Sequence, residues 1–210
     1  MKSKKNNSKN KISKEIFHEL REHSPFTFLA TLIAILLVAM IKFSLLKEIP
    51  GTLFHIMHPA HVFVSAIVSA ALFYKYKKNI IQSLLVGVGA SIIIGSISDV
   101  LIPWLGGGLF KFQTEFHLPL IEETFLIVST ALIGSTLGII LKISKEPHFL
   151  HVLLSVFASL FYLTSFSHSL SYIEFLIMVI IVFIAVLIPC CMSDIFFPII
   201  LAKSKHKHNK

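Results

Sequence analysis

The chain has 210 residues, of which 55% are hydrophobic and only 14% are charged, and its mean hydropathy is +0.81. Ordinary soluble domains carry roughly 25% charged residues, so this composition excludes a soluble globular protein and indicates a polytopic membrane protein. The formal net charge of +8 does not indicate nucleic-acid binding, because the basic residues gather in the tails and in short loops.

Six apolar stretches are each near the ~20 residues that a helix needs to cross a ~30 Å hydrocarbon core. We therefore predict an all-α fold with six transmembrane helices. The predicted spans are residues 25–46, 52–74, 80–105, 121–143, 148–165 and 172–201. The third span should break at Pro103 and at the glycine run 106–108. Residues 1–24 form a basic tail whose later part is expected to be a short surface helix, and residues 202–210 form a second basic tail.

The distribution of lysine and arginine predicts the orientation. If both termini are cytoplasmic, all but three of the nineteen basic residues lie on the cytoplasmic side, and the three are Lys42, Lys47 and Lys111. This positive-inside bias predicts an integral protein of the plasma (inner) membrane with both ends in the cytoplasm.

A polar stripe occurs twice in the chain, and it is the strongest signal in the sequence. The spacing i, i+3, i+7, i+11 places four side chains on one helical face. The first copy is His58, His61, Ser65 and Ser69, and the second is His148, His151, Ser155 and Ser159. Each copy is followed by the pattern Ser-Asp-x-x-x-Pro, which contains Asp99 in the first case and Asp194 in the second.

This repetition predicts two three-helix repeats, residues 25–108 and 109–201. Because each repeat has an odd number of spans, the second would enter the membrane inverted relative to the first. Inverted three-plus-three repeats are a building plan of secondary transporters, with the substrate site at the repeat interface. This is an analogy of architecture, and architecture alone does not establish function.

Ionisable side chains at membrane depth are costly, and they usually face the protein interior in functional positions. Imidazole with carboxylate suits Zn, Mn, Fe or Ni, and an added thiolate shifts the preference toward Zn, Cu(I) or Fe. The predicted metal ligands are His58, His61, Asp99, His117, Glu122, Glu123, His148, His151, Cys190, Cys191 and Asp194.

Simpler interpretations compete with this one. The serines of the stripes are more typical of helix packing contacts than of ligands, and His55 is more typical of a hydrogen-bonded packing residue. An aspartate such as Asp99 can equally cap a broken helix or bond a neighbouring serine. The two adjacent cysteines have no counterpart in the first repeat, where Gly95 and Ser96 occupy the matching positions, and buried cysteines are often inert.

The favoured function is therefore a transporter or permease for a divalent transition-metal ion, coupled to protons, to the metal gradient or to a partner. An intramembrane metal- or haem-dependent enzyme or redox protein is the first alternative. A non-catalytic scaffold subunit is the second. The expected partners are the lipid bilayer and a metal ion, without nucleic acid, and a homo-oligomer or a partner subunit is left open.

A spatial prediction follows from the topology. His61 and Asp99 should lie in one leaflet with their polar atoms about 3–6 Å apart. His151 and Asp194 should pair in the opposite leaflet, so that the two half-sites either stay separate or merge near the midplane. Because an unpartnered carboxylate in hydrocarbon costs several kcal/mol, each aspartate should face protein.

Overall fold

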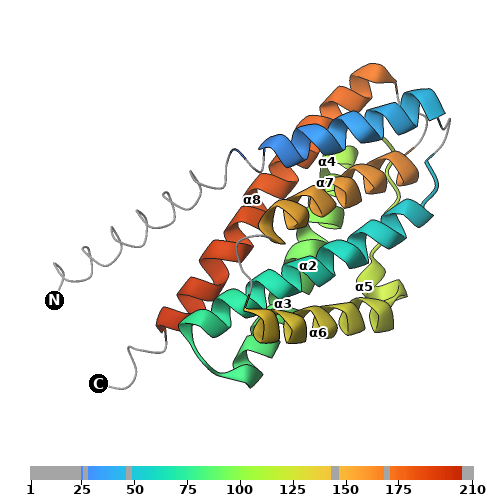
Figure 1. Cartoon of the computed structure of the whole chain (residues 1–210). Helices are drawn as coiled ribbons and strands as arrows, with labels where there is room; N and C mark the ends of the chain where they lie inside the picture. The colour runs from blue at the N-terminus through green and yellow to red at the C-terminus, as the bar shows by residue number, and fades with distance from the viewer. Residues whose placement is uncertain (1–24, 26–27, 46–48, 143–146, 168–170, 205–210) are drawn as a thin grey trace.

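The computed structural model describes residue 25 and residues 28–45, 49–142, 147–167 and 171–204. Within the last two helices, only the backbone is described for residues 147–148, 188 and 190–204. The described part of the chain is all-helical, without strands, which confirms the predicted all-α class. Figure 1 shows the helices as one elongated bundle.

The helices follow the apolar stretches of the sequence closely. The first helix, Phe28–Leu45, ends in a π-helical segment, η1 (Ile41–Leu45). The remaining elements, in chain order, are α2 (Thr52–Tyr76), α3 (Ile80–Ser96), η2 (Ile97–Leu101), α4 (Ile102–Leu109), α5 (Pro119–Glu122), α6 (Thr124–Leu141), α7 (Pro147–Phe166) and α8 (Tyr172–Ser204).

Five of the helical stretches described are long and apolar enough to cross a membrane. They are Phe28–Leu45, Thr52–Tyr76, Ile80–Leu109, Thr124–Leu141 and Phe149–Phe166. In α8 the apolar stretch Tyr172–Leu187 is shorter, so the sixth span and the inverted-repeat architecture stay predictions. Many large apolar side chains point outward, including Phe125 at 87% exposure and Leu109 at 77%, as expected for a surface covered by lipid tails.

The predicted break of the third span at Pro103 and the glycine run is wrong. The helix continues from Ile80 to Leu109, because Pro103 lies at the start of α4, directly after the π-helical segment η2. The wider turn of a π-helix interrupts the usual bonding ladder, so a proline is accepted there without ending the helix. The fourth span also begins later than predicted, since a kink at Glu123 separates α5 from α6.

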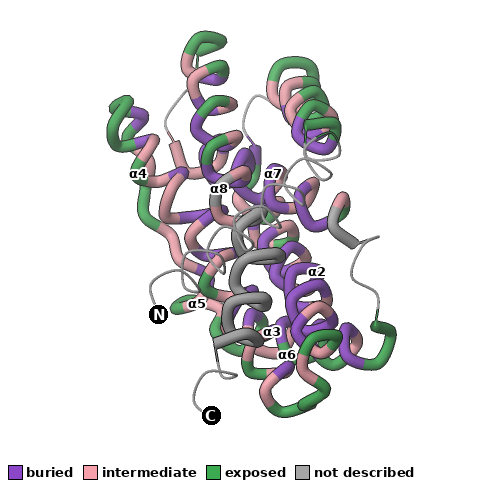
Figure 2. The backbone as a smooth tube through the Cα atoms, turned by 90° about the vertical axis from the view of Figure 1, so that its left-hand side faces the viewer, coloured by how far each residue is buried: buried purple, intermediate pink, exposed green. Residues whose placement is uncertain are grey.

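Helix α2 is the centre of the bundle. It packs against α3, α6 and α7, and in Figure 2 most of its length is coloured as buried. Glycines permit the close approach of α6: a Cβ at Gly134 would collide with the Phe63 carbonyl oxygen, and one at Gly138 with that of Ile67. This glycine pair at i, i+4 is the small-residue spacing by which membrane helices pack closely.

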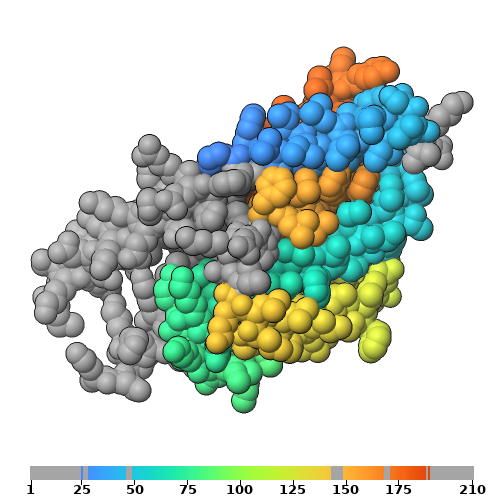
Figure 3. All heavy atoms as spheres, in the orientation of Figure 1, coloured from blue at the N-terminus to red at the C-terminus, as the bar shows by residue number. Residues whose placement is uncertain are grey.

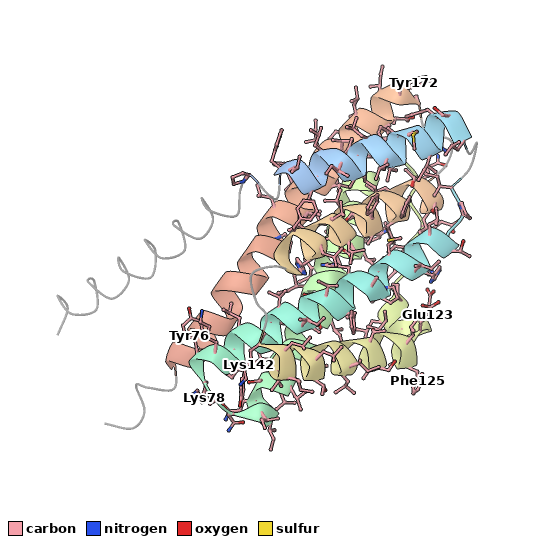
Figure 4. The ribbon with its side chains drawn as sticks, in the orientation of Figure 1. Tyr76, Lys78, Glu123, Phe125, Lys142 and Tyr172 are labelled. Carbon is pink, nitrogen blue, oxygen red and sulfur yellow. The ribbon has the colours of Figure 1, made fainter. Side chains whose placement is uncertain are left out.

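The two ends of the bundle differ in charge. Figure 4 shows Tyr76, Lys78 and Lys142 at one end, whereas Glu123 and Phe125 lie at the other. In Figure 3 the first helix, α7, α2 and α6 follow one another across the visible face, all inclined in a similar direction. Lys78 and Lys142 therefore lie together at one end of the bundle.

Candidate metal centre

Three helical segments bring their polar side chains together inside the bundle. Helix α2 contributes His58 and His61, which are one turn apart on its buried face. The π-helical segment η2 contributes Asp99 from the neighbouring span, and α7 contributes Ser155. All four residues are at most 1% exposed, so the centre is sealed from solvent. Single-turn π segments within α-helices frequently mark functional sites.

The Asp99 carboxylate is the hub of the centre. Its Oδ2 atom accepts from His58 Nδ1 at 2.9 Å and from His61 Nδ1 at 2.6 Å. Its Oδ1 atom accepts from the hydroxyl of Ser98 at 2.7 Å and from that of Ser155 at 2.9 Å. Four donors on two oxygens compensate for the loss of water, which is why a carboxylate is tolerated at this depth. The predicted His61–Asp99 contact and the inward orientation of Asp99 are confirmed, and the distance of 2.6 Å is that of a direct hydrogen bond, shorter than expected.

Space for the two imidazoles is left by a glycine on α3. A Cβ built on Gly95 would lie 3.1 Å from Val62 Cγ2, 3.6 Å from His58 Cε1 and 3.8 Å from His61 Nδ1. An added Cβ would therefore crowd Val62 and contact both rings, so that a side chain larger than alanine would press on the rings. In the sequence alone, Gly95 is only the counterpart of a cysteine in the second repeat.

The second polar stripe reaches the same centre. The ring of His151, which is fully buried, lies with its centroid 4.6 Å from that of His61. The Ser159 hydroxyl donates to the Ser98 carbonyl at 3.2 Å and to the Ser155 carbonyl at 2.7 Å. The stripes of α2 and α7 therefore face each other across the helix interface.

The prediction that His151 belongs to a separate site in the opposite leaflet is wrong, because its ring is in contact with that of His61. The alternative in which the half-sites merge describes the observed arrangement of these two histidines. The physical reason is that buried imidazoles need polar surroundings, and α2 and α7 pack directly on each other. One shared cluster provides these surroundings for both stripes.

The group of His58, His61 and Asp99 could hold a metal ion. Each residue offers one ligand atom, and these atoms all lie within 4.8 Å of one another. Two ligands of one zinc ion stand roughly 3.3 Å apart at a tetrahedral angle, so modest side-chain movement would complete the geometry. His58 Nε2 is buried and has no hydrogen-bond partner among the described residues, which leaves a lone pair available to a cation.

Three further predicted ligands lie elsewhere, at the end where α2 begins: His117, from the loop after the third span, and Glu122 and Glu123, from the entrance of the fourth. His117 Nδ1 is 2.8 Å from Glu122 Oε2, and Glu123 Oε1 is 2.9 Å from the Nδ1 atom of His55. His117 belongs to the segment between α4 and α5, outside the spans. Burial lowers the pKa of His117 below its ordinary value, and the adjacent Glu122 carboxylate partly offsets this effect. This cluster is partly exposed, in contrast to the Asp99 centre.

Four further predicted ligands cannot be placed. The side chains of His148, Cys190, Cys191 and Asp194 lie outside the described residues, although the backbone of each belongs to α7 or α8. Their assignment as ligands, and the predicted pairing of His151 with Asp194, stay predictions.

Two members of the polar clusters were missed by the sequence interpretation. Ser155 was expected to be a packing residue, yet it donates directly to Asp99. His55 was also expected to be a packing residue, yet its Nε2 atom lies 3.1 Å from that of His117. The signal for His55 was present, because it precedes His58 by three residues and so extends the stripe by one turn.

Comparison of the chain with protein-family models, with curated proteins and with solved structures finds no significant match.

Proposed function

We propose that the chain is an integral membrane permease for a divalent transition-metal ion and that His58, His61 and Asp99 bind the ion during transport. The observation that carries the proposal is the convergence of two imidazoles and a carboxylate, all at 0% exposure, within apolar helices long enough to span a membrane. Polar groups at this depth are expensive, and they are typical of ion pathways. Imidazole and carboxylate together suit Zn, Mn, Fe or Ni.

The hydrogen bonds of the centre indicate which hydrogens an ion would displace. Both histidines hold the same Asp99 oxygen through Nδ1, so an ion bound between these atoms takes the place of the imidazole hydrogens. A neutral imidazole would then carry its hydrogen on the other ring nitrogen, so binding of the ion rearranges the hydrogens of the centre without a net release of protons. His151 lies against His61 and supplies a further imidazole to the same cluster.

The proposed orientation has both termini in the cytoplasm of a cell bounded by the plasma (inner) membrane. Its support is the position of Lys78 and Lys142 together at one end of the bundle, opposite Glu123 (Figure 4). The sixth span in this proposal is α8, whose helical backbone extends from Tyr172 to Ser204.

A haem bound by the two histidines of α2 is the less suitable alternative. The axial ligands of a haem approach the iron from opposite faces, whereas His58 and His61 come from one helix and contact one carboxylate oxygen. A scaffold function is also less suitable, because helix association alone needs no group of three potential metal ligands at one point.

Metal uptake into proteoliposomes tests the proposal. The purified chain is reconstituted with a metal-sensitive dye inside, and Zn²⁺ or Mn²⁺ is added outside. We expect wild-type uptake to exceed that of empty vesicles, and Asp99→Asn to reduce the rate by more than tenfold. The same variant should lose the corresponding bound ion in equilibrium dialysis.

Ser91→Ala is the matched control. Ser91 is a fully buried polar residue of the same span, and its hydroxyl bonds the Val88 carbonyl of its own helix rather than the Asp99 centre. Uptake should be unchanged in this variant. Equal metal accumulation by wild type, Asp99→Asn and empty vesicles would refute transport. Reduced thermal stability of Asp99→Asn with unchanged metal uptake would instead support the scaffold interpretation.

A further inference from the structure

A second cluster of histidines and carboxylates lies at the end of the bundle where α2 begins. His55 precedes His58 by three residues, which is roughly 4.5 Å along the helix axis. His117 reaches it from the segment between α4 and α5, and Glu122 and Glu123 follow at the end of α5. Figure 4 shows Glu123 at this end of the molecule.

The two imidazoles face each other through the nitrogen atoms that metals use. His55 Nε2 and His117 Nε2 are 3.1 Å apart. On the far side of each ring, Nδ1 lies close to a carboxylate oxygen: 2.9 Å for His55 and Glu123, 2.8 Å for His117 and Glu122. Neither Nδ1 contact has hydrogen-bond geometry, and the hydrogen bond of this pair joins the two Nε2 atoms, so that one ring donates to the other. The carboxylate beside each Nδ1 favours a hydrogen on that nitrogen when Nε2 binds a cation.

With the hydrogen on Nδ1 in both rings, each Nε2 would offer a lone pair in place of the hydrogen that joins the two atoms in the hydrogen-bonded pair. A cation that binds both lone pairs must lie off the line between the two nitrogen atoms, because their separation of 3.1 Å is too short for an ion directly between them. Two imidazoles that bind one ion at ~2.0–2.1 Å with a tetrahedral angle have their nitrogen atoms ~3.3 Å apart. The observed separation is therefore close to that of two ligands of a single metal ion.

We infer that His55 and His117 form a second metal site, in which both Nε2 atoms bind one divalent transition-metal ion and Glu123 and Glu122 orient the rings. Metal-binding histidines commonly direct their other ring nitrogen to a carboxylate, which fixes the tautomer and raises the basicity of the ligand. In this cluster each histidine has a carboxylate beside its Nδ1 atom, Glu123 for His55 and Glu122 for His117.

Aromatic packing holds the two rings in place. The His117 ring is stacked on Phe166 with centroids 4.7 Å apart, and Phe54 contacts both imidazoles edge-on. The side chains of His55 and His117 are 28% and 20% exposed, so water can complete the coordination. An ion at this site can exchange with solution, unlike one at the fully buried Asp99 centre.

The position suggests a role, and this role rests on the proposed transport function. His55, His58 and His61 follow one another along α2, from the partly exposed site to the buried centre. The second site would be the first position that an ion occupies before it moves inward. The binding of the ion itself does not depend on transport.

Histidine modification by diethyl pyrocarbonate tests the site directly. The full chain in detergent micelles is treated with and without Zn²⁺, and modification of each histidine is measured by mass spectrometry, which separates His55 and His117 from the tail histidines. We expect Zn²⁺ to slow the modification of both residues by at least tenfold. Glu123→Gln and Glu122→Gln should raise the Zn²⁺ concentration needed for protection by about 10–100-fold.

Glu115→Gln is the matched control, since it removes the same charge from an exposed residue of the same loop. Protection should be unchanged in this variant. Equal modification of His55 and His117 with and without saturating Zn²⁺ would overturn the site and would show that a shared proton joins the rings. An equal effect of Glu115→Gln and Glu123→Gln would also overturn it, because general surface charge would then explain the protection.

The experiments distinguish a failure of the proposed transport function from a failure of the second metal site. Asp99→Asn should retain the protection of His55 and His117 while it loses metal uptake. Uptake in Asp99→Asn equal to that of the wild type would refute the proposed function and leave the second site intact. Absence of protection in a wild-type protein that transports metal would refute the second site alone.

Discussion

The two copies of the polar stripe offer a controlled comparison of one substitution in two environments. Ser65 and Ser155 occupy the same position of the stripe, and both are at most 1% exposed. The Ser155 hydroxyl donates to the Asp99 carboxylate at 2.9 Å, whereas the Ser65 hydroxyl has no partner among the described residues. Replacement by alanine should therefore change the free energy of unfolding in different directions.

For Ser155→Ala we expect a loss of about 1–2 kcal/mol. Hydrogen bonds between membrane helices contribute about 0.6 kcal/mol on average and up to about 1.7, and hydrogen bonds to a charged group are stronger than average. For Ser65→Ala we expect no loss, and a gain of up to about 1 kcal/mol, because a buried hydroxyl without a partner is itself unfavourable. The small volume of one hydroxyl limits any cavity term in both variants.

Unfolding of the two variants by sodium dodecyl sulfate in mixed micelles, followed by circular dichroism, measures both changes against the wild type. Ser155→Ala should unfold at a lower detergent fraction, and Ser65→Ala at the same or a higher one. Equal destabilisation by the two substitutions would refute the reasoning, because packing volume rather than the bond to Asp99 would then control the effect.

Three further outcomes follow from individual contacts. Gly138→Ala should destabilise the fold by about 1–3 kcal/mol, because the added Cβ meets the backbone of α2. Gly89→Ala should be neutral or slightly stabilising in the same unfolding assay, because no atom lies within 4 Å of the added Cβ. Gly95→Val should weaken Zn²⁺ binding at the buried centre by at least tenfold in equilibrium dialysis, because its methyl groups press on the His58 ring; unchanged affinity would contradict the proposed ligand arrangement. Tyr162→Phe removes the hydroxyl that bonds the backbone of the loop before α5, so it should lower the free energy of unfolding by about 0.5–1.5 kcal/mol. It should also speed the modification of His117 by diethyl pyrocarbonate, and an unchanged rate would show that other contacts hold the loop.

The sequence by itself determined the class of the protein and the helices that could span a membrane. Apolar length is a local property, so the bounds of α2 and α7 were predicted to within two residues. The identity of the buried centre was also partly accessible, because helical periodicity places His58 and His61 on one face and membrane depth makes Asp99 need a partner. The break expected at Pro103 failed for a local reason, since a π-helical turn accommodated the proline.

Only the tertiary structure decided which polar groups meet. The sequence assigned His61 and His151 to different leaflets, because it gives the order of helices but neither their tilt nor their relative height. Packing of α7 against α2 places the two rings together and lets Ser155 bond Asp99. Likewise, no periodicity relates His55 to His117, which are 62 residues apart. Their contact exists because the segment after α4 folds back over the start of α2, and such long-range contacts depend on the packing of the whole bundle.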